Sequence, residues 1–180
     1  MVYFCYTCYM ESAFRFKLVG ESCVFIDWGN VYGWTKSLKS EIDIKKLYAY
    51  LKEYKDINGI RFYYGEDKND KSKDFLKEVE RIGYEVVTKP VKYVKTPAGI
   101  KRKCDFDLEI GLDCFERLDD YKTFVFFSGD GDYYTLYERL IKRGKQVIVV
   151  YMYGHLGREV WLLKRGIYKI SIIKLNLLKK

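Results

Sequence analysis

Residues 123–132 read Thr-Phe-Val-Phe-Phe-Ser-Gly-Asp-Gly-Asp, so an apolar run leads directly into glycines and aspartates. An uninterrupted apolar run of this length is typical of a strand buried on both faces of a parallel sheet. The stretch Val24–Ile26 has the same form and is followed at once by Asp27. We therefore expect both strands to lie at the centre of one sheet.

Working outward from these two stretches, the chain alternates between strand patterns and segments with helical spacing. Right-handed crossovers between such strands give a doubly wound parallel sheet sandwiched by helices, an α/β fold. Ligands bind such sheets at the carboxyl ends of the strands. Residues 89–103, which hold both prolines, are expected to be irregular. The expected strands are 23–26, 60–64, 84–87, 123–127, 146–151 and 168–173, and the expected helices are 42–54, 70–82, 105–115, 133–142 and 158–164.

The composition indicates one soluble globular domain. The chain has 180 residues, 48% of them apolar, and a net charge of +8. Neither a membrane-spanning run nor a signal-peptide layout is visible, so we expect a cytoplasmic protein that does not bind membranes. The basic balance favours polyanions such as nucleic acid, although a lysine-rich solvated surface would look the same. Residues 22–180 are predicted to form the domain and residues 1–21 an N-terminal extension, within which Met10 could be the natural start.

Cysteine usage argues against a disulfide framework, because the number of cysteines, five, is odd. Cys5 and Cys8 form one CxxC pair, which is a weak zinc signal in a chain with a single histidine, His155. Cys23, Cys104 and Cys114 stand in apolar surroundings and are expected in the core.

Aspartates follow both central strands, and this is the strongest chemical signal in the chain. Asp27 ends the first strand, and Asp130 and Asp132 follow the other. Several carboxylates at one sheet edge are electrostatically costly unless a cation neutralises them, and oxygen ligands suit Mg²⁺ or Mn²⁺. Ordinary turn chemistry is the alternative explanation for the Ser-Gly-Asp-Gly-Asp run.

A third acidic element is expected on the helix at 105–115. On a helical wheel Asp107 lies inside the apolar arc, next to the space left by Gly111, whereas Asp105 faces solvent. A buried aspartate needs a partner such as a metal, although helix N-capping would also explain it. Asp113 lies at the edge of the arc and is a further candidate ligand. The arc is formed by Phe106, Ile110 and Cys114 on one side and by Leu108, Leu112 and Phe115 on the other.

Basic and aromatic residues precede this helix, in an arrangement that suits contacts with a phosphate backbone and with bases. A plain solvated loop is the alternative. The candidate nucleic-acid contacts are Lys92, Tyr93, Lys95, Lys101, Arg102 and Lys103.

Three of these segments together resemble the NYN domain of the PIN-like nuclease superfamily, in its LabA-type branch. Phe25–Asn30 resembles the first motif, an aspartate with an asparagine three residues on. Lys103–Asp113 resembles the helix motif, and Ser128–Tyr133 resembles the third motif, Ser-Gly-Asp-x-Asp-Phe. Cys104 and Phe106 replace the usual valines, and Tyr133 replaces the phenylalanine.

The resemblance implies a sheet with strand order 3-2-1-4-5 and a metal-dependent endoribonuclease that hydrolyses RNA, single-stranded or structured. Asp27, Asp107, Asp130 and Asp132 would hold Mg²⁺ or Mn²⁺, with Asn30 and Ser128 orienting ligands or phosphate. A nucleic-acid-binding regulatory module with little turnover and a single-strand DNA nuclease are the alternatives. The sequence leaves self-association into a homodimer open.

Overall fold

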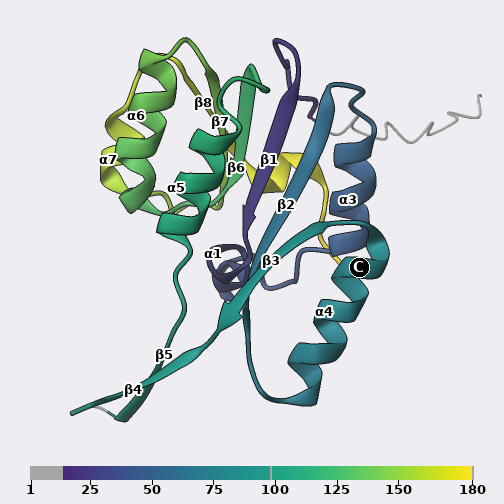
Figure 1. Cartoon of the computed structure of the whole chain (residues 1–180), viewed down its shortest axis with the longest axis vertical. Coiled ribbons are helices and arrows are strands. Elements are labelled where there is room, and N and C mark those ends of the chain that lie inside the picture. The colour runs from purple at the N-terminus through teal and green to yellow at the C-terminus, as the bar shows by residue number, and fades with distance from the viewer. Residues whose placement is uncertain (1–13, 98, 180) are drawn as a thin grey trace, which may run out of the picture.

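A computed structural model describes residues 14–97 and 99–179 of the chain. Its centre is a six-stranded sheet in the order β3-β2-β1-β6-β7-β8, with every neighbouring pair parallel (Figure 1). The strands are β1 (Ser22–Asp27), β2 (Ile57–Glu66), β3 (Glu85–Pro90), β6 (Thr123–Phe127), β7 (Gln146–Tyr151) and β8 (Ile167–Ser171).

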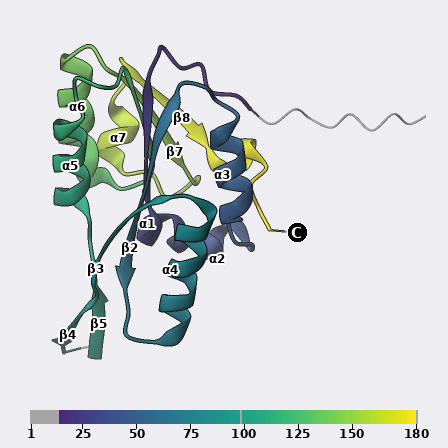
Figure 2. The same ribbon diagram turned by 45° about the vertical axis from the view of Figure 1, so that its right-hand side comes forward.

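Helices cover both faces of this sheet, as Figure 2 shows when the molecule is turned. On one side lie α3 (Ile44–Lys52) and α4 (Asp70–Ile82), and on the other α5 (Asp107–Glu116), α6 (Tyr134–Lys142) and α7 (Arg158–Leu162). Two short helices, α1 (Trp28–Gly33) and α2 (Thr35–Leu38), follow β1 directly. The 3-10 turns are η1 (Gly131–Tyr133) and η2 (Ile172–Leu175).

The α/β fold with a parallel sheet flanked by helices is confirmed, whereas the predicted strand order differs in detail. The expected order had five strands, and the sheet has six because β8 adds an edge beyond β7. Two further strands, β4 (Lys92–Thr96) and β5 (Gly99–Lys103), form a separate sheet and shift the numbering.

The hydrophobic core is split into two clusters by the sheet, because alternate residues of each strand face opposite sides. In β1, Val24 and Ile26 pack under α3 and α4, whereas Cys23 and Phe25 pack under α5 and α6. The ring of Phe25 stacks on that of Phe126 in the neighbouring β6, with centroids 5.2 Å apart. The strand is therefore buried on both faces, as its unbroken apolar run predicts.

Element boundaries match the sequence where start and stop signals are strong. Helix α4 begins after Asn69, whose side chain accepts a hydrogen bond from the N–H of Ser72 at 2.9 Å. It ends at Gly83, which has a φ of 112° in the left-handed region that favours glycine. Helices α1 and α2 were not predicted, because elements of one or two turns are too short to show a periodicity.

The prediction of an irregular segment at 89–103 is wrong. Strand β3 runs through Pro90, and β4 and β5 pair antiparallel as a hairpin that projects beyond the body of the domain (Figure 1). Both hairpin strands are exposed along their length. Without a buried face, they lack the alternation of apolar and polar residues by which strands are predicted.

The prediction of a wide apolar arc on α5 is wrong on one side. Phe106, Ile110 and Cys114 are buried, but the side chains of Leu108, Leu112 and Phe115 are exposed by 69%, 54% and 37%. Of the core cysteines, Cys23 and Cys114 are fully buried and Cys104 is half-buried.

Residues 14–21 pack on the domain. Phe16 is buried against the rings of Tyr50 and Tyr54, and its N–H donates a hydrogen bond to the Tyr54 hydroxyl at 2.8 Å. The predictions made for Cys5, Cys8 and Met10 lie outside the described residues. Within residues 14–97 and 99–179, no helix combines the length and the apolar character that a membrane crossing requires.

Candidate active site

The predicted acidic residues meet where the strand order of the sheet reverses. Strands β1 and β6 are neighbours, with Ile26 paired to Phe127, so Asp27 and the loop after β6 emerge side by side. The first residue of α5, Asp107, joins them from the covering helix layer.

Asp27 is the centre of this group. It is half-buried, and its Oδ1 accepts a hydrogen bond from the N–H of Asn30 at 3.2 Å, which caps the start of α1. Burial raises the pKa of Asp27 to about 6, and the negative charges of Asp107 and Asp130 contribute to the rise. Asp27 thus lies close to two other carboxylates and is held in a position where its own charge is costly.

Asp107 is in the same electrostatic environment. It is half-buried, whereas Asp105 is exposed, as the helical wheel predicts. Burial raises the pKa of Asp107, and Asp130, Asp105 and Asp132 add to the effect. The site therefore combines Asp27 and Asp107 with a third carboxylate, Asp130, whose charge contributes to the raised pKa of the other two.

Tyr133 is a site residue that the motif comparison treated only as a mild departure. Its buried hydroxyl lies 3.4 Å from Oδ2 of Asp27 and is close enough to Asp107 for its hydrogen bond to lower the pKa of that carboxyl. The phenylalanine usual at this place in the motif has no such hydroxyl. The sequence does carry a signal for this role, because Tyr133 places a hydroxyl donor where the motif has the apolar ring of phenylalanine.

Asn30 and Ser128 position the loop after β6. Oδ1 of Asn30 accepts hydrogen bonds from the N–H of Gly129 at 2.9 Å and from Nε1 of Trp34 at 3.1 Å. The buried Ser128 hydroxyl accepts from the N–H of Asp130 at 3.2 Å. The hydrogen bond between Asn30 and Gly129 joins the start of α1 to the loop after β6, beside the acidic group.

Asp130 and Asp132 differ in exposure. Asp130 is half-buried and its Oδ1 accepts from the N–H of Asp132 at 3.0 Å, which fixes the η1 turn. Asp132 is exposed. Across the described residues, no three His, Cys, Asp or Glu side chains are placed closely enough to ligate one ion together. The donor set still suits a hard cation by its chemistry, since carboxylate oxygens left mutually repulsive at one sheet edge are what such an ion neutralises.

Two glycines allow the loop after β6 to pack against the loop before α7. A Cβ at Gly129 would overlap the carbonyl oxygen of His155, and one at Gly157 would overlap the backbone of Gly131. The N–H of Gly157 also donates to the carbonyl oxygen of Gly129 at 2.7 Å. Gly129 is therefore needed for the close approach of two backbones.

Asp113 is engaged in a different cluster. Its carboxylate lies 2.7 Å from a guanidinium nitrogen of Arg61 and accepts a hydrogen bond from the Tyr63 hydroxyl. Both partners of the ion pair are largely buried, with side chains 13% and 16% exposed. Asp113 is therefore already neutralised by a protein cation.

The six candidate nucleic-acid contacts all lie on the hairpin β4–β5 and are exposed. Tyr93 and Arg102 face each other across it, and both contact Asp67, at 2.7 Å and 3.2 Å. Lys103 pairs with Asp105 at 3.7 Å, where the hairpin leads into α5. The basic residues thus extend outward from the chain segment that carries Asp107.

Three comparisons place these features among known proteins. The chain is 26% identical over 142 residues to the Low amplitude and bright protein LabA of Synechococcus elongatus, an alignment that covers 76% of each chain. Its fold matches the crystal structure of a protein of unknown function from Vibrio parahaemolyticus, with a TM-score of 0.72 and 23% identity over 92% of this chain and 100% of the other. The family model described as NYN domain matches residues 21–160. The chain therefore belongs to the NYN domain family and resembles its LabA-type proteins.

Proposed function

We propose that this protein is a divalent-metal-dependent ribonuclease whose site is formed by Asp27, Asp107, Asp130 and Asp132. The observation that carries the proposal is the meeting of Asp27 and Asp107 with Asp130 at the switch point of the sheet, where the pKa of the first two is raised. Carboxylates gathered at an electrostatic cost are characteristic of functional sites.

In this proposal the carboxylates would hold Mg²⁺ or Mn²⁺, which when bound supplies a Lewis acid that activates water and neutralises charge on the leaving oxygen. Asp27 and Asp107 come from rigid elements, the end of β1 and the start of α5. Asn30 and Ser128 fix the loop that carries Asp130. The Tyr133 hydroxyl lies close to both Asp27 and Asp107 and would donate its one hydrogen to either carboxylate.

A second candidate is a nucleic-acid-binding module without turnover. The observation that favours it is the spacing of the acidic side chains, which would have to rotate toward one another to ligate an ion jointly. The basic hairpin β4–β5 would bind RNA in the same way in a nuclease and in a binding module.

The function is tested by comparing Asp107→Asn with the matched control Asp105→Asn, because the two aspartates differ in burial. Labelled single-stranded RNA and DNA are incubated with each protein in Mg²⁺, Mn²⁺ or EDTA. We expect RNA cleavage only with metal, a loss of roughly 10²–10³-fold in Asp107→Asn, and a much smaller loss in Asp105→Asn. Wild-type protein that binds RNA but cleaves nothing with any metal would favour the second candidate.

The role of the hairpin is tested with a Lys92→Ala, Lys101→Ala and Arg102→Ala triple variant. We expect weaker RNA binding across sequences and a smaller slope of log affinity against log salt, by roughly 0.7 for each lost phosphate contact on a single strand. At saturating RNA the variant should keep much of its turnover, because these contacts bind ground state and transition state alike. An unchanged salt slope would show that the hairpin does not touch the backbone.

A further inference from the structure

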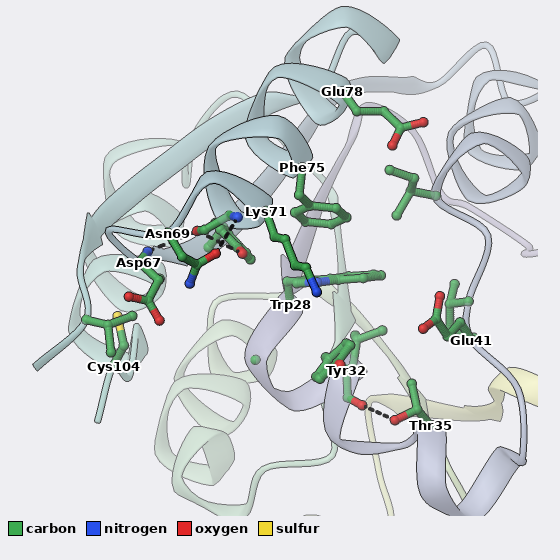
Figure 3. Close-up of a pocket in the computed structure, with 18 of the residues that line it drawn as sticks. Trp28, Tyr32, Thr35, Glu41, Asp67, Asn69, Lys71, Phe75, Glu78 and Cys104 are labelled. Carbon is green, nitrogen blue, oxygen red and sulfur yellow. Dashed lines mark hydrogen bonds between the residues drawn. The ribbon is translucent and has the colours of Figure 1, made fainter. Parts of the chain in front are cut away.

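A groove begins at Gly29, two residues after Asp27, and lies between α1, the start of α4 and the segment before α3. Its volume is about 910 Å³, within the range of roughly 300–1,000 Å³ that holds small ligands. Figure 3 shows that its walls come from α1, from the end of β2 with the start of α4, and from the segment before α3. None of the sequence motifs predicts this groove, because its lining is drawn from separate parts of the chain.

One end of the groove reaches the acidic site. Gly29 lines it, and a Cβ at Gly29 would lie 3.5 Å from Oδ1 of Asp27. Cys104, also in the lining, stands three residues before Asp107 in the chain. A chain whose phosphate lies at the aspartates could therefore continue directly into the groove.

One wall of the groove is aromatic, and the ring of Tyr32 in it is exposed. Trp28 is buried and stacks on Phe75 at 5.5 Å, so its ring is fixed from behind. Tyr32 lies one helical turn further along α1 and is 58% exposed. A rigid aromatic surface with an exposed tyrosine beside it is suited to stacking of a flat ring such as a nucleobase.

The acids that line the groove are already engaged, three of them with basic side chains that also line it. Glu41 pairs with Lys179, Glu78 lies 3.0 Å from Lys45, and Asp67 pairs with Arg102. Asp43 accepts two backbone N–H groups at the start of α3.

Lys71 differs from the other basic residues that line the groove. It extends from the start of α4 into the groove (Figure 3) and makes no ion pair with any residue that the structure describes. A cation in this position is available for phosphate.

We propose that the groove binds the nucleotide next to the scissile phosphate of a single-stranded RNA, with its base stacked on Tyr32 and its phosphate paired with Lys71. The position of the scissile phosphate rests on the proposed function. Only an unpaired nucleotide can place its base there, so the groove would select single strands over duplexes.

The stacking is tested by measuring, in EDTA so that nothing is cleaved, the affinity of a fluorescein-labelled ten-nucleotide RNA. We expect Tyr32→Ala to bind about tenfold more weakly and Tyr32→Phe to bind like wild type. The control is Tyr168→Ala on edge strand β8, because Tyr168 is also 58% exposed but lies outside the groove. Binding of the same RNA as a duplex should respond equally to both alanine variants. Adenosine monophosphate is then added as a competitor. If it displaces the RNA, the groove is a site for a free nucleotide, and if it does not, the groove requires the strand.

The phosphate contact is tested by comparing Lys71→Ala with Lys77→Ala, an exposed lysine of the same helix outside the lining. We expect the slope of log affinity against log salt to fall by about 0.7 for Lys71→Ala only. Equal single-strand affinities for wild type, Tyr32→Ala and Tyr168→Ala overturn the groove proposal, even if the protein cleaves RNA. Tyr32-dependent binding without cleavage in Mg²⁺ or Mn²⁺ overturns the nuclease proposal and supports the groove.

Discussion

An Asp27→Asn variant is expected to lose metal-dependent RNA cleavage by roughly 10³-fold, because it removes a charged oxygen at the centre of the acidic site. Asparagine can still accept the hydrogen bond from Asn30 that caps α1, so the fold should persist. RNA affinity should stay similar or rise, since one negative charge facing the phosphate is gone.

The same variant is expected to be more stable than wild type when no metal is present. The pKa of Asp27 is about 6 in the folded protein against an ordinary value of 3.8. The unfolded chain therefore ionises first, and wild type loses stability as the pH rises from about 4 to about 6, with the loss persisting above that. The variant avoids this loss, which is about 1–3 kcal/mol.

Urea unfolding at pH 4 and pH 7.5, in EDTA and in Mg²⁺, measures both effects. At pH 7.5 in EDTA the variant should be the more stable, and at pH 4 the two should nearly coincide. Added Mg²⁺ should stabilise wild type by mass action and leave the variant unchanged. An Asp27→Asn protein that is less stable at pH 7.5 in EDTA would show that the carboxylate is favourably paired instead.

The second large effect is expected for Asp113→Asn, which should destabilise the protein by about 3 kcal/mol. The change removes the negative partner of Arg61, whose side chain is 13% exposed and whose other partner, Glu85, is half exposed. The largely buried guanidinium would then keep only the half-exposed Glu85 as a counter-ion, at 3.2 Å. Glu116→Gln is the matched control, because Glu116 is on the same helix and 69% exposed.

Calorimetry with and without Mn²⁺ decides between this structural role and a ligand role. A structural Asp113 predicts a lower melting temperature and an unchanged shift on adding Mn²⁺. If Asp113→Asn instead melts like wild type without metal and loses the Mn²⁺ shift, Asp113 is a metal ligand and the ion pair with Arg61 contributes little.

The sequence predicts the strands that are buried on both faces of the sheet, because their apolar runs are unbroken. The apolar runs before Asp27 and before Ser128 predict central strands, and the carboxyl ends of two parallel neighbours necessarily lie at the same edge of the sheet. The helical wheel predicts the difference in exposure between Asp107 and Asp105, although Asp105 lies before the first residue of α5, so its exposure does not come from the geometry of that helix. The metal and the RNA contacts stay predictions.

The features that were not predicted are those that depend on a packing partner far away in the sequence, or on the absence of such a partner. Leu108 and Leu112 look like core residues, but whether a helix face is covered depends on what packs against it. The hairpin β4–β5 buries neither face, so its strands carry no pattern. The pairing of Asp113 with Arg61 joins α5 to β2, a contact between distant segments that no local pattern encodes.

The place of β1 between β2 and β6 has a consequence for how the chain is made. Val24 pairs with Ile60 on one side and with Val125 on the other, so the second edge of β1 stays open until the segment around residue 125 has been synthesised. At ribosomal rates of about 5–20 residues per second, that interval is roughly 5–20 s. During it, the apolar stretch Cys23–Ile26 of β1, with unpaired backbone groups, is available to other nascent chains. The acidic site itself cannot form before this closure, since Asp130 lies beyond the strand that completes it.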